Sequence, residues 1–278
     1  AGIISAAGEN VDQNRVGERV LIQPLIYCGN CAPCKRGWEN MCNRSGIMGE
    51  SHPGIHAQKI AVQQSQAVPV PDSLPFPQAA AFALVAQTSY QMLVNRAQLE
   101  KDDWVMVWGA GSGVGSMAIQ IAKAKQARVI AISGSDQKLE KAKNLGADIC
   151  INYQNDDVIR MVKKVTDGKG VNIVFEHVGE ATWDISMRSL AKGGRVVTCG
   201  ATSGARASVN LTHLFFKQQS ILGSTMGSLS AFRGSMELLF TGKIVPIVDK
   251  IFPMEQIADA HIYLESASQY GKVVLSNE

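Results

Sequence analysis

The chain has few charged residues and no concentration of either sign. Charged side chains make up 18% of its 278 residues, and 27 basic against 24 acidic residues give a net charge of +3. Hydrophobic residues reach 46%, which is ample for a packed core and, with so few charges, argues against a disordered chain. Because no basic run is present, the composition does not indicate a nucleic-acid partner. At roughly 150 residues per domain, the length predicts two domains.

Long apolar runs are also missing, and no leader segment is expected. No uninterrupted apolar stretch is long enough to span a bilayer, and no charged segment followed by an apolar one opens the chain. No disulfide ladder runs along the sequence, since only Cys150 and Cys199 lie outside one short cysteine cluster. Unpaired thiols of this kind indicate a reducing compartment, so the sequence predicts a cytoplasmic protein without a membrane partner.

The cysteine cluster is the most informative motif. Cys28, Cys31, Cys34 and Cys42 follow the spacing C-x2-C-x2-C-x7-C in the run YCGNCAPCKRGWENMC. Four thiolates so close in sequence can converge on one tetrahedral ion, and an all-sulfur tetrahedron suits zinc or iron. With four protein ligands no coordination position is left for a substrate, so the ion would be structural. Two disulfides or four unrelated thiols are the alternatives, and the spacing favours zinc.

The middle of the chain alternates short apolar strands with helices, which is typical of a parallel sheet covered on both faces. Six strands are expected, near residues 104–108, 127–133, 149–153, 171–179, 195–200 and 221–225. Helices are expected between them at residues 116–126, 136–146, 157–167 and 181–194. The predicted fold class is therefore α/β, with a doubly wound parallel sheet.

A glycine-rich loop, GAGSGVG at residues 109–115, follows the first of these strands and precedes the first helix. Small residues there let the backbone approach a pyrophosphate, whose charge faces the helix N-terminus. The loop departs from strict G-x-G-x-x-G, since Val114 and Ser116 stand where glycines would be needed. A glycine turn in a nucleotide-free α/β protein is the alternative, and the strand–loop–helix context favours a dinucleotide.

The end of the second strand bears on the choice between NAD and NADP. An NAD site usually has Asp or Glu there, about 20 residues beyond the loop, to hold the ribose 2′-hydroxyl. Here the segment reads SGSDQK, and hydroxyls at Ser133 and Ser135 with a cation at Lys138 suit a 2′-phosphate. Asp136 could bind a ribose instead, but its position favours capping of the next helix. The segment favours NADP and leaves NAD open.

Further motifs accompany the cysteine cluster and the glycine loop: PVPDSLPFPQAAAFALVAQTSYQML, FEHVGEATW, RVVTCGATSG, FFKQQSILGSTMG and GKVVLS. With them the chain resembles the medium-chain dehydrogenase/reductase superfamily over nearly its whole length. VWGAGSGVGSMAIQIAKA and FEHVGEAT look like its quinone-reductase and enoyl-CoA (crotonyl-CoA) reductase side. The resemblance implies a GroES-like catalytic domain with a zinc lobe, residues 28–42, and an inserted Rossmann domain. The GroES-like domain is expected at residues 1–93 with 229–278, and the Rossmann domain at residues 94–228.

The resemblance also implies a homodimer or homotetramer, assembled through the edge strand near residues 221–225.

Two departures from the family pattern bear on the reaction. The chain opens at AGIISAAGENV, which looks like the strand just after the family's glycine-histidine-glutamate or equivalent motif. We therefore expect the preceding part of the GroES-like domain, with the usual first two catalytic zinc ligands, to be absent. Alcohol dehydrogenases of the family place a further catalytic zinc ligand four residues before the threonine of a T-x-Y segment, which here is Leu84. Leucine cannot bind zinc, and no Cys, His, Asp or Glu lies from Gln78 to Leu99.

Without a Lewis acid, alcohol oxidation is hard to support. The leading hypothesis is therefore hydride transfer from NADPH to an activated C=C bond of a small-molecule substrate, an enone or enoyl thioester, or to a quinone. A zinc-dependent alcohol dehydrogenase is one alternative. A non-catalytic NADPH-binding protein is the other, since relatives of the quinone reductases serve as structural lens proteins.

The resemblance also assigns residues to the cofactor. Thr88 would approach the nicotinamide, and the pyrophosphate would be surrounded by Gly109, Gly113, Val114 and Gly115. The 2′-phosphate end would be held by Ser133, Ser135, Lys138 and Tyr153. Further contacts are expected where the later strands end, at His177, Val178, Gly179, Gly200, Ala201, Ser224 and Thr225. His177 is also the catalytic candidate, as a donor of a hydrogen bond or a proton, with a packed residue at a strand end as the alternative.

Overall fold

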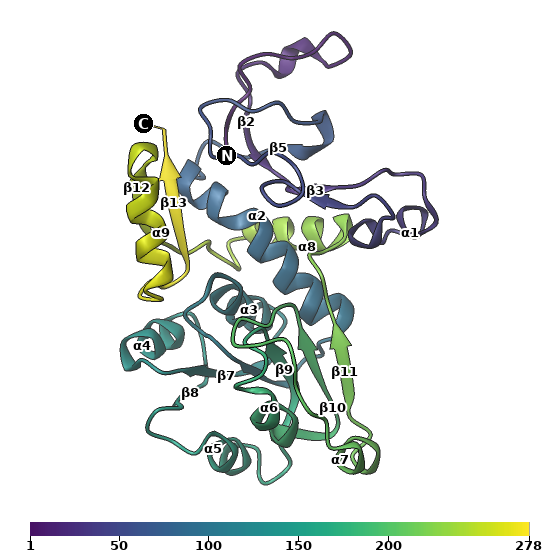
Figure 1. Cartoon of the computed structure of the whole chain (residues 1–278), viewed down its shortest axis with the longest axis vertical. Helices are drawn as coiled ribbons and strands as arrows, with labels where there is room; N and C mark the ends of the chain where they lie inside the picture. The colour runs from purple at the N-terminus through teal and green to yellow at the C-terminus, as the bar shows by residue number, and fades with distance from the viewer. Residues whose placement is uncertain (278) are drawn as a thin grey trace. The chain divides into compact units, whose positions relative to one another are not determined.

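The computed structural model describes residues 1–277 and divides into two compact units (Figure 1). The first unit combines Ala1–Val85 with Pro246–Glu278, and the second is the uninterrupted segment Ala86–Val245. The predicted domain division at residues 94 and 228 stays a prediction, because compact packing alone does not establish which segments fold by themselves. Within residues 1–277, no helix has both the length and the apolar character needed to cross a membrane.

The second unit is built on a six-stranded sheet of order β11-β10-β9-β6-β7-β8 in which every neighbouring pair is parallel. Its strands are β6 Trp104–Val107, β7 Arg128–Ser133, β8 Ile149–Asn152, β9 Val171–Glu176, β10 Leu190–Thr198 and β11 Ser220–Gly223. The chain runs outward from β6 to β8 and then returns to β9 on the other side of β6. The strand order therefore reverses between β6 and β9, which is where sheets of this kind bind ligands.

Helices cover both faces of this sheet, with α3 and α4 on one side and α5 and α6 on the other (Figure 1). The helices of the unit are α3 Gly113–Ala124, α4 Asp136–Asn144, α5 Val158–Val165, α6 Trp183–Ser189, α7 Leu211–Phe216 and α8 Leu229–Phe240. Strand side chains such as Met106, Ile130 and Val174 have no exposed surface. Burial on both faces explains why these strands read as continuous apolar runs. The predicted doubly wound sheet is confirmed.

The predicted helix at residues 181–194 is wrong in its second half. Helix α6 ends at Ser189, and β10 begins at Leu190, with a register break against β9 between Leu190 and Arg195. Gly193 has a φ of +70°, a left-handed conformation that glycine accepts and a right-handed helix does not contain. Leu190 pairs with Val171 of β9 and is buried. Pairing with the neighbouring strand therefore overrides the local helical preference of this segment.

The first unit is mainly β structure. Strands β1 Gly2–Ile3, β2 Arg19–Ile22 and β5 Ala67–Pro69 form an antiparallel sheet, and β3 Leu25–Ile26 pairs antiparallel with β4 Gly46–Ile47. In the C-terminal segment, β12 Val248–Pro253 and β13 Lys272–Ser276 pair in parallel, connected through α9 Ile257–Glu265. The short helical segments are α1 Ala32–Lys35, η1 Gln13–Arg15, η2 Glu39–Met41, η3 Gln64–Gln66 and η5 Met254–Gln256. The predicted zinc lobe is the connection between β3 and β4.

Helix α2, Phe76–Tyr90, runs across the division between the units and continues as a π-helical segment, η4 Gln91–Arg96. Its C-terminal part is fixed within the second unit. Gln87 donates through Nε2 to the Gly227 carbonyl oxygen at 2.6 Å, and Gln91 accepts the backbone N–H of Ser228 at 3.3 Å. These contacts hold Thr88, one of the predicted cofactor residues, in the same unit as the parallel sheet.

Candidate functional site

The four thiols of the zinc lobe converge. All four Sγ atoms lie within 4.8 Å of one another, and Cys31 Sγ is 3.4 Å from Cys34 Sγ and 3.8 Å from Cys42 Sγ. Zn–S bonds of about 2.3 Å in a tetrahedron give S···S edges of about 3.8 Å, so these separations fit zinc. None of the four cysteines is in a disulfide. Across residues 1–277, no other group of three or more His, Cys, Asp or Glu side chains has ligand geometry for a metal ion.

Local backbone geometry builds this lobe. Gly29 and Gly37 have φ angles of +73° and +75°, so the chain turns through conformations that favour glycine. Cys31 is the N-cap of α1, whose first turn contains proline. The backbone N–H groups of Cys28 and Arg44 each point at Cys42 Sγ at 3.3 Å. Such N–H groups stabilise a thiolate and orient it toward a cation.

The thiol pKa values differ within the lobe. Backbone hydrogen bonds, first from Asn30 and then from Cys31, lower the pKa of Cys28 to about 6. Backbone hydrogen bonds from Cys34 and Asn43 also lower the pKa of Cys31, whereas burial raises the pKa of Cys34 to about 12. Metal ligands must be deprotonated, so binding of zinc at neutral pH would release the proton of Cys34.

The glycine loop lies at the carboxyl end of β6. Ser112 caps α3, because its hydroxyl accepts the backbone N–H of Gly115 at 2.9 Å. A Cβ on Gly115 would lie 2.3 Å from the Gly109 carbonyl oxygen, and a Cβ on Gly109 would lie 2.7 Å from the His177 ring. Gly109 also has a φ of +56°. Both positions therefore require glycine, and the backbone turns tightly at a helix N-terminus with little side-chain bulk, a feature that suits a pyrophosphate.

Two predicted cofactor residues carry hydroxyls that make no hydrogen bond to the described protein, Thr88 Oγ1 and Ser224 Oγ, and both oxygens are buried. Thr88 lies on α2, and Ser224 follows β11 at the edge of the sheet. A buried hydroxyl without a partner costs about 1–3 kcal/mol, so a polar ligand at either position would be stabilising. The glycine turn and these two hydroxyls fit a dinucleotide.

His177 follows β9, and its ring lies against the glycine loop. Its Nε2 is 3.0 Å from the Trp108 carbonyl oxygen and 3.3 Å from Ser112 Oγ. A carbonyl oxygen only accepts, so we assign the proton to Nε2, which donates to Trp108. Burial lowers the pKa of His177, so the ring is neutral at pH 7. Proton donation from Nε2 to a substrate would therefore first require loss of the contact with Trp108.

The end of β7 is organised by serine hydroxyls. Ser133 Oγ accepts the backbone N–H of Ser135 at 3.3 Å, and Ser135 Oγ accepts that of Lys138 at 3.4 Å. Ser135 is thus the N-cap of α4, and the predicted capping role of Asp136 is wrong. Asp136 instead accepts a hydrogen bond from Asn152 Nδ2 at 2.6 Å. The acid nearest the ribose position is therefore held by the neighbouring strand.

The other predicted cofactor residues also follow strands of the same sheet. Tyr153 follows β8, and a Cβ on Gly134 would lie 2.7 Å from its exposed ring. The loops after β9 and β10 are joined, since Ser203 donates its backbone N–H and its Oγ–H to the Val178 carbonyl oxygen at 2.7 and 2.8 Å. The remaining residues after β9, β10 and β11 are Gly179, Gly200, Ala201 and Thr225. Apart from Thr88 on α2, the predicted cofactor residues gather at the carboxyl end of one sheet.

Sequence reasoning missed Glu176, the last residue of β9, whose side chain is fully buried. Its Oε1 accepts backbone N–H groups at 2.9, 2.7 and 3.2 Å, those of His177, Val178 and Gly179. Its Oε2 accepts hydroxyl protons at 2.9 and 2.7 Å, those of Thr182 and Ser186. The sequence does contain a signal for this residue, because FEHVG places an acidic side chain at the end of an otherwise apolar strand.

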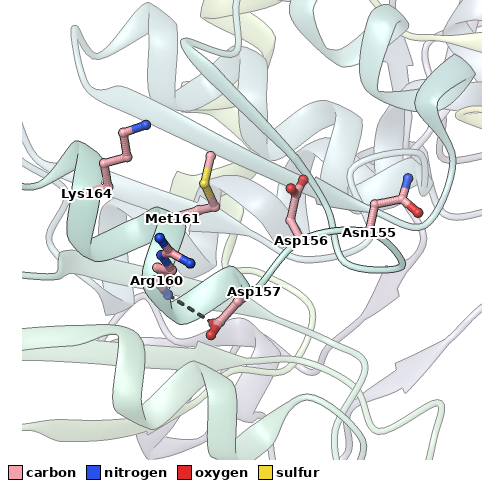
Figure 2. Close-up of a pocket in the computed structure, with 6 residues that line it drawn as sticks. All are labelled: Asn155, Asp156, Asp157, Arg160, Met161 and Lys164. Atoms are coloured by element: carbon pink, nitrogen blue, oxygen red, sulfur yellow. Dashed lines mark hydrogen bonds between the residues drawn. The ribbon is translucent and has the colours of Figure 1, made fainter.

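A surface depression of about 500 Å³ lies beside α5 and contains none of the predicted cofactor residues (Figure 2). It is lined by Asn155, Asp156, Asp157, Arg160, Met161 and Lys164. The Asp157 carboxylate caps α5 by accepting the backbone N–H of Arg160 at 3.0 Å, and Asp156 accepts the backbone N–H of Asn152 at 3.3 Å. Both carboxylates therefore accept hydrogen bonds from the nearby backbone.

Comparison with known proteins identifies the class. The zinc-binding dehydrogenase family matches residues 113–241, and the alcohol dehydrogenase GroES-like domain matches residues 1–72. An alcohol dehydrogenase of Geobacillus stearothermophilus is 31% identical over 99% of this chain and 80% of its own length. The chain belongs to the zinc-type medium-chain dehydrogenase/reductase superfamily and is an oxidoreductase of that superfamily. The predicted family and the predicted combination of a Rossmann sheet with a GroES-like domain are confirmed.

Two solved structures show how far this similarity extends. A crystal structure of an NAD-dependent alcohol dehydrogenase has a TM-score of 0.96 and 39% identity, covering 100% of this chain and 81% of its own. The 2-octenoyl-CoA carboxylase reductase CinF, in complex with NADP and 2-octenoyl-CoA, has a TM-score of 0.86 and 31% identity, covering 94% of this chain and 63% of its own. Alcohol dehydrogenases and enoyl-CoA reductases are thus both similar to this chain.

Proposed function

We propose that this protein transfers hydride from NADPH to an activated C=C bond or a quinone, with zinc in a structural role only. The observation that carries the proposal is Leu84, which the family resemblance aligns with the position of a catalytic zinc ligand in alcohol dehydrogenases. Its side chain has no lone pair to offer a metal. Reduction of an enone, a quinone or an enoyl thioester needs an oriented nicotinamide and hydrogen-bond donors for the developing enolate, and no Lewis acid.

The end of β7 supports NADPH as the hydride donor. Its hydroxyls at Ser133 and Ser135 and the cation at Lys138 suit a 2′-phosphate. The acid of this segment, Asp136, is engaged by Asn152. The NADP complex of the related CinF also supports this choice.

In this proposal the bound cofactor supplies the hydride, and the residues of the chain bind and orient it. The backbone of the glycine loop and the first N–H groups of α3 would hold the pyrophosphate. The buried hydroxyls of Thr88 and Ser224 would each gain a polar partner. The neutral ring of His177 would keep the end of β6 in place through the Trp108 carbonyl. The zinc lobe would stabilise its own segment of the first unit.

The second candidate is an alcohol dehydrogenase that uses NAD. The alcohol dehydrogenases among the relatives favour it, including the NAD-dependent enzyme at 39% identity. This reading requires a second zinc ion, with ligands other than Leu84, and a ribose contact at the end of β7 in place of a phosphate contact.

Parallel titration with NADPH and NADH, followed by cofactor fluorescence, is the first test. We expect the chain to bind NADPH more tightly, to oxidise it in the presence of enones, quinones or enoyl thioesters, and to be indifferent to simple alcohols. Elemental analysis should give one zinc ion per chain. Two zinc ions with NAD⁺-dependent oxidation of alcohols would overturn the proposal in favour of the second candidate, and binding without turnover on any acceptor would favour a non-catalytic dinucleotide-binding protein.

Assembly into a homodimer or homotetramer is part of the proposal. Strand β11 lies at the edge of the six-stranded sheet, and Phe215, Phe216 and Ile221 near it are exposed. An uncovered strand edge beside exposed aromatic side chains is suited to pairing with a second copy. Light scattering coupled to size-exclusion chromatography would measure the mass, and a monomer at micromolar concentration would contradict this part of the proposal.

A further inference from the structure

Glu176 connects the two strands between which the strand order reverses. Its carboxylate has five neutral hydrogen-bond donors, three backbone N–H groups after β9 and the hydroxyls of Thr182 and Ser186. Three successive N–H groups directed at one oxygen form an anion-binding nest, and here the chain fills it with its own side chain.

The network continues from Glu176 to the glycine loop. Ser186 Oγ donates to Glu176 at 2.7 Å and accepts the indole N–H of Trp108 at 2.8 Å. Trp108 directly precedes Gly109, and its carbonyl oxygen accepts the Nε2–H of His177 at 3.0 Å. The end of β6 is therefore joined to the β9 loop twice, through the Trp108 side chain and through its backbone.

This arrangement points to a role in binding, which rests on the proposed function. We propose that Glu176 is a positioning residue for the nicotinamide dinucleotide. Its carboxylate holds His177–Gly179 and, through Ser186 and Trp108, the start of the glycine loop in the conformation that accepts the cofactor. Without the carboxylate, three backbone N–H groups, of which that of Gly179 is buried, would lack an acceptor, and the loop would rearrange to satisfy them. Cofactor binding would then have to restore the loop conformation, and the cost of doing so would weaken the affinity for the cofactor.

Glu176→Gln tests the proposal at constant side-chain size. The amide oxygen can still face the N–H groups, but the amide nitrogen then donates toward Ser186, whose own hydroxyl proton loses its acceptor. We expect the NADPH dissociation constant to rise about tenfold. The indole N–H resonance of Trp108, identified by its absence in Trp108→Phe, should shift in the cofactor-free protein. Glu176→Asp keeps the charge and the contacts nearest the backbone, so it should restore part of the affinity.

Thr166→Val is the matched control at the other end of β9. Thr166 is buried, and its hydroxyl donates to the Val162 carbonyl oxygen at 2.7 Å and accepts the Gly170 N–H at 2.9 Å. The substitution should lower the melting temperature while leaving the NADPH dissociation constant within about twofold of wild type. It should not move the Trp108 resonance.

The outcomes distinguish positioning of the cofactor loops by Glu176 from an effect on protein stability alone. Glu176→Gln that binds NADPH as wild type does, or Thr166→Val that loses as much affinity, would overturn the role of Glu176 while leaving the proposed function intact. Wild-type protein that binds neither NADPH nor NADH would overturn the proposed function, and this inference with it. If Glu176→Gln fails to fold, Ser186→Ala is the second test, because it removes the hydroxyl that joins Glu176 to Trp108 and leaves the three backbone contacts of the carboxylate. An unchanged NADPH affinity in that variant would refute the connection.

Discussion

The zinc lobe and the cofactor site are assembled in different ways. The lobe draws its four thiols from residues 28–42, and positive-φ turns at Gly29 and Gly37 lie between them. The proposed cofactor site draws on residues from Thr88 to Thr225, which meet mainly because parallel strands end at the same edge of a sheet. A site of the first kind depends on its own short segment, whereas a site of the second kind depends on strand order, loop backbone and buried supporting groups. A substitution in one site should therefore change zinc binding or cofactor binding without changing the other.

The strongest test removes the metal. Cys31→Ser takes one thiolate from the lobe, where structural zinc contributes about 10–16 kcal/mol of apparent binding free energy in small domains. We expect loss of zinc and a large fall in melting temperature, with the preference between NADPH and NADH unchanged. Elemental analysis, calorimetry and cofactor titration measure the three quantities. Cys150→Ser, outside the cluster, is the control. An unchanged melting temperature and zinc content in Cys31→Ser would contradict the structural role.

The converse test damages the cofactor site and spares the lobe. In Gly115→Ala the new Cβ would lie 2.3 Å from the Gly109 carbonyl oxygen, so the backbone of the turn must shift. We expect a loss of about 1–3 kcal/mol in the free energy of unfolding, together with loss of NADPH binding and retention of zinc. In Gly223→Ala the Cβ would meet no atom within 4 Å, and stability should stay within about 0.5 kcal/mol of wild type. NADPH binding by Gly115→Ala would show that the loop does not hold the pyrophosphate.

A smaller effect is expected at the 2′-phosphate end. Lys138→Ala removes a cation from the first turn of α4 and should weaken NADPH about three- to tenfold while NADH changes little. Lys143→Ala, in the last turn of the same helix, changes the net charge equally and serves as the control. Equal losses for the two cofactors in Lys138→Ala would place the 2′-phosphate elsewhere.

The smallest effect concerns pH. Burial lowers the pKa of His177, so the folded chain keeps the ring neutral while the unfolded chain takes up a proton as pH falls through about 6.5. The stability from the neutral ring is therefore complete above that pH and decreases below it. The melting temperature should fall from pH 7.5 to pH 5.5, and His177→Asn should reduce that slope. His213→Asn, on the exposed helix α7, is the control. An equal slope in His177→Asn would contradict the burial of this ring.

Local signals were enough for much of the fold and for the metal ligands. Apolar runs separated by turns predicted the six strands, and cysteine spacing predicted a cluster whose thiols do converge. Two local predictions were wrong where a neighbouring strand decided the outcome: Leu190 pairs with β9 and leaves the helix, and Asp136 bonds to Asn152 and leaves the cap to Ser135.

The hydrogen-bond network behind the proposed cofactor site was the feature least predictable from the sequence. Glu176 becomes interpretable only when Trp108 and Ser186, 78 positions apart in the chain, are seen to share a hydrogen bond. Sequence spacing carries no record of such a contact, because it depends on which strands are neighbours and on how deeply the side chains are buried.

The interrupted first unit has a consequence for folding kinetics. Its two segments are separated by the whole of Ala86–Val245, and the hydrogen bond from Asn277 Nδ2 to the Ala57 carbonyl oxygen spans 220 positions. Contacts of such long range form slowly, because the chain between them must be closed first. All six strands of the parallel sheet lie within the intervening segment. Refolding should therefore proceed in order, with the inserted segment nucleating early and the flanking segments meeting last.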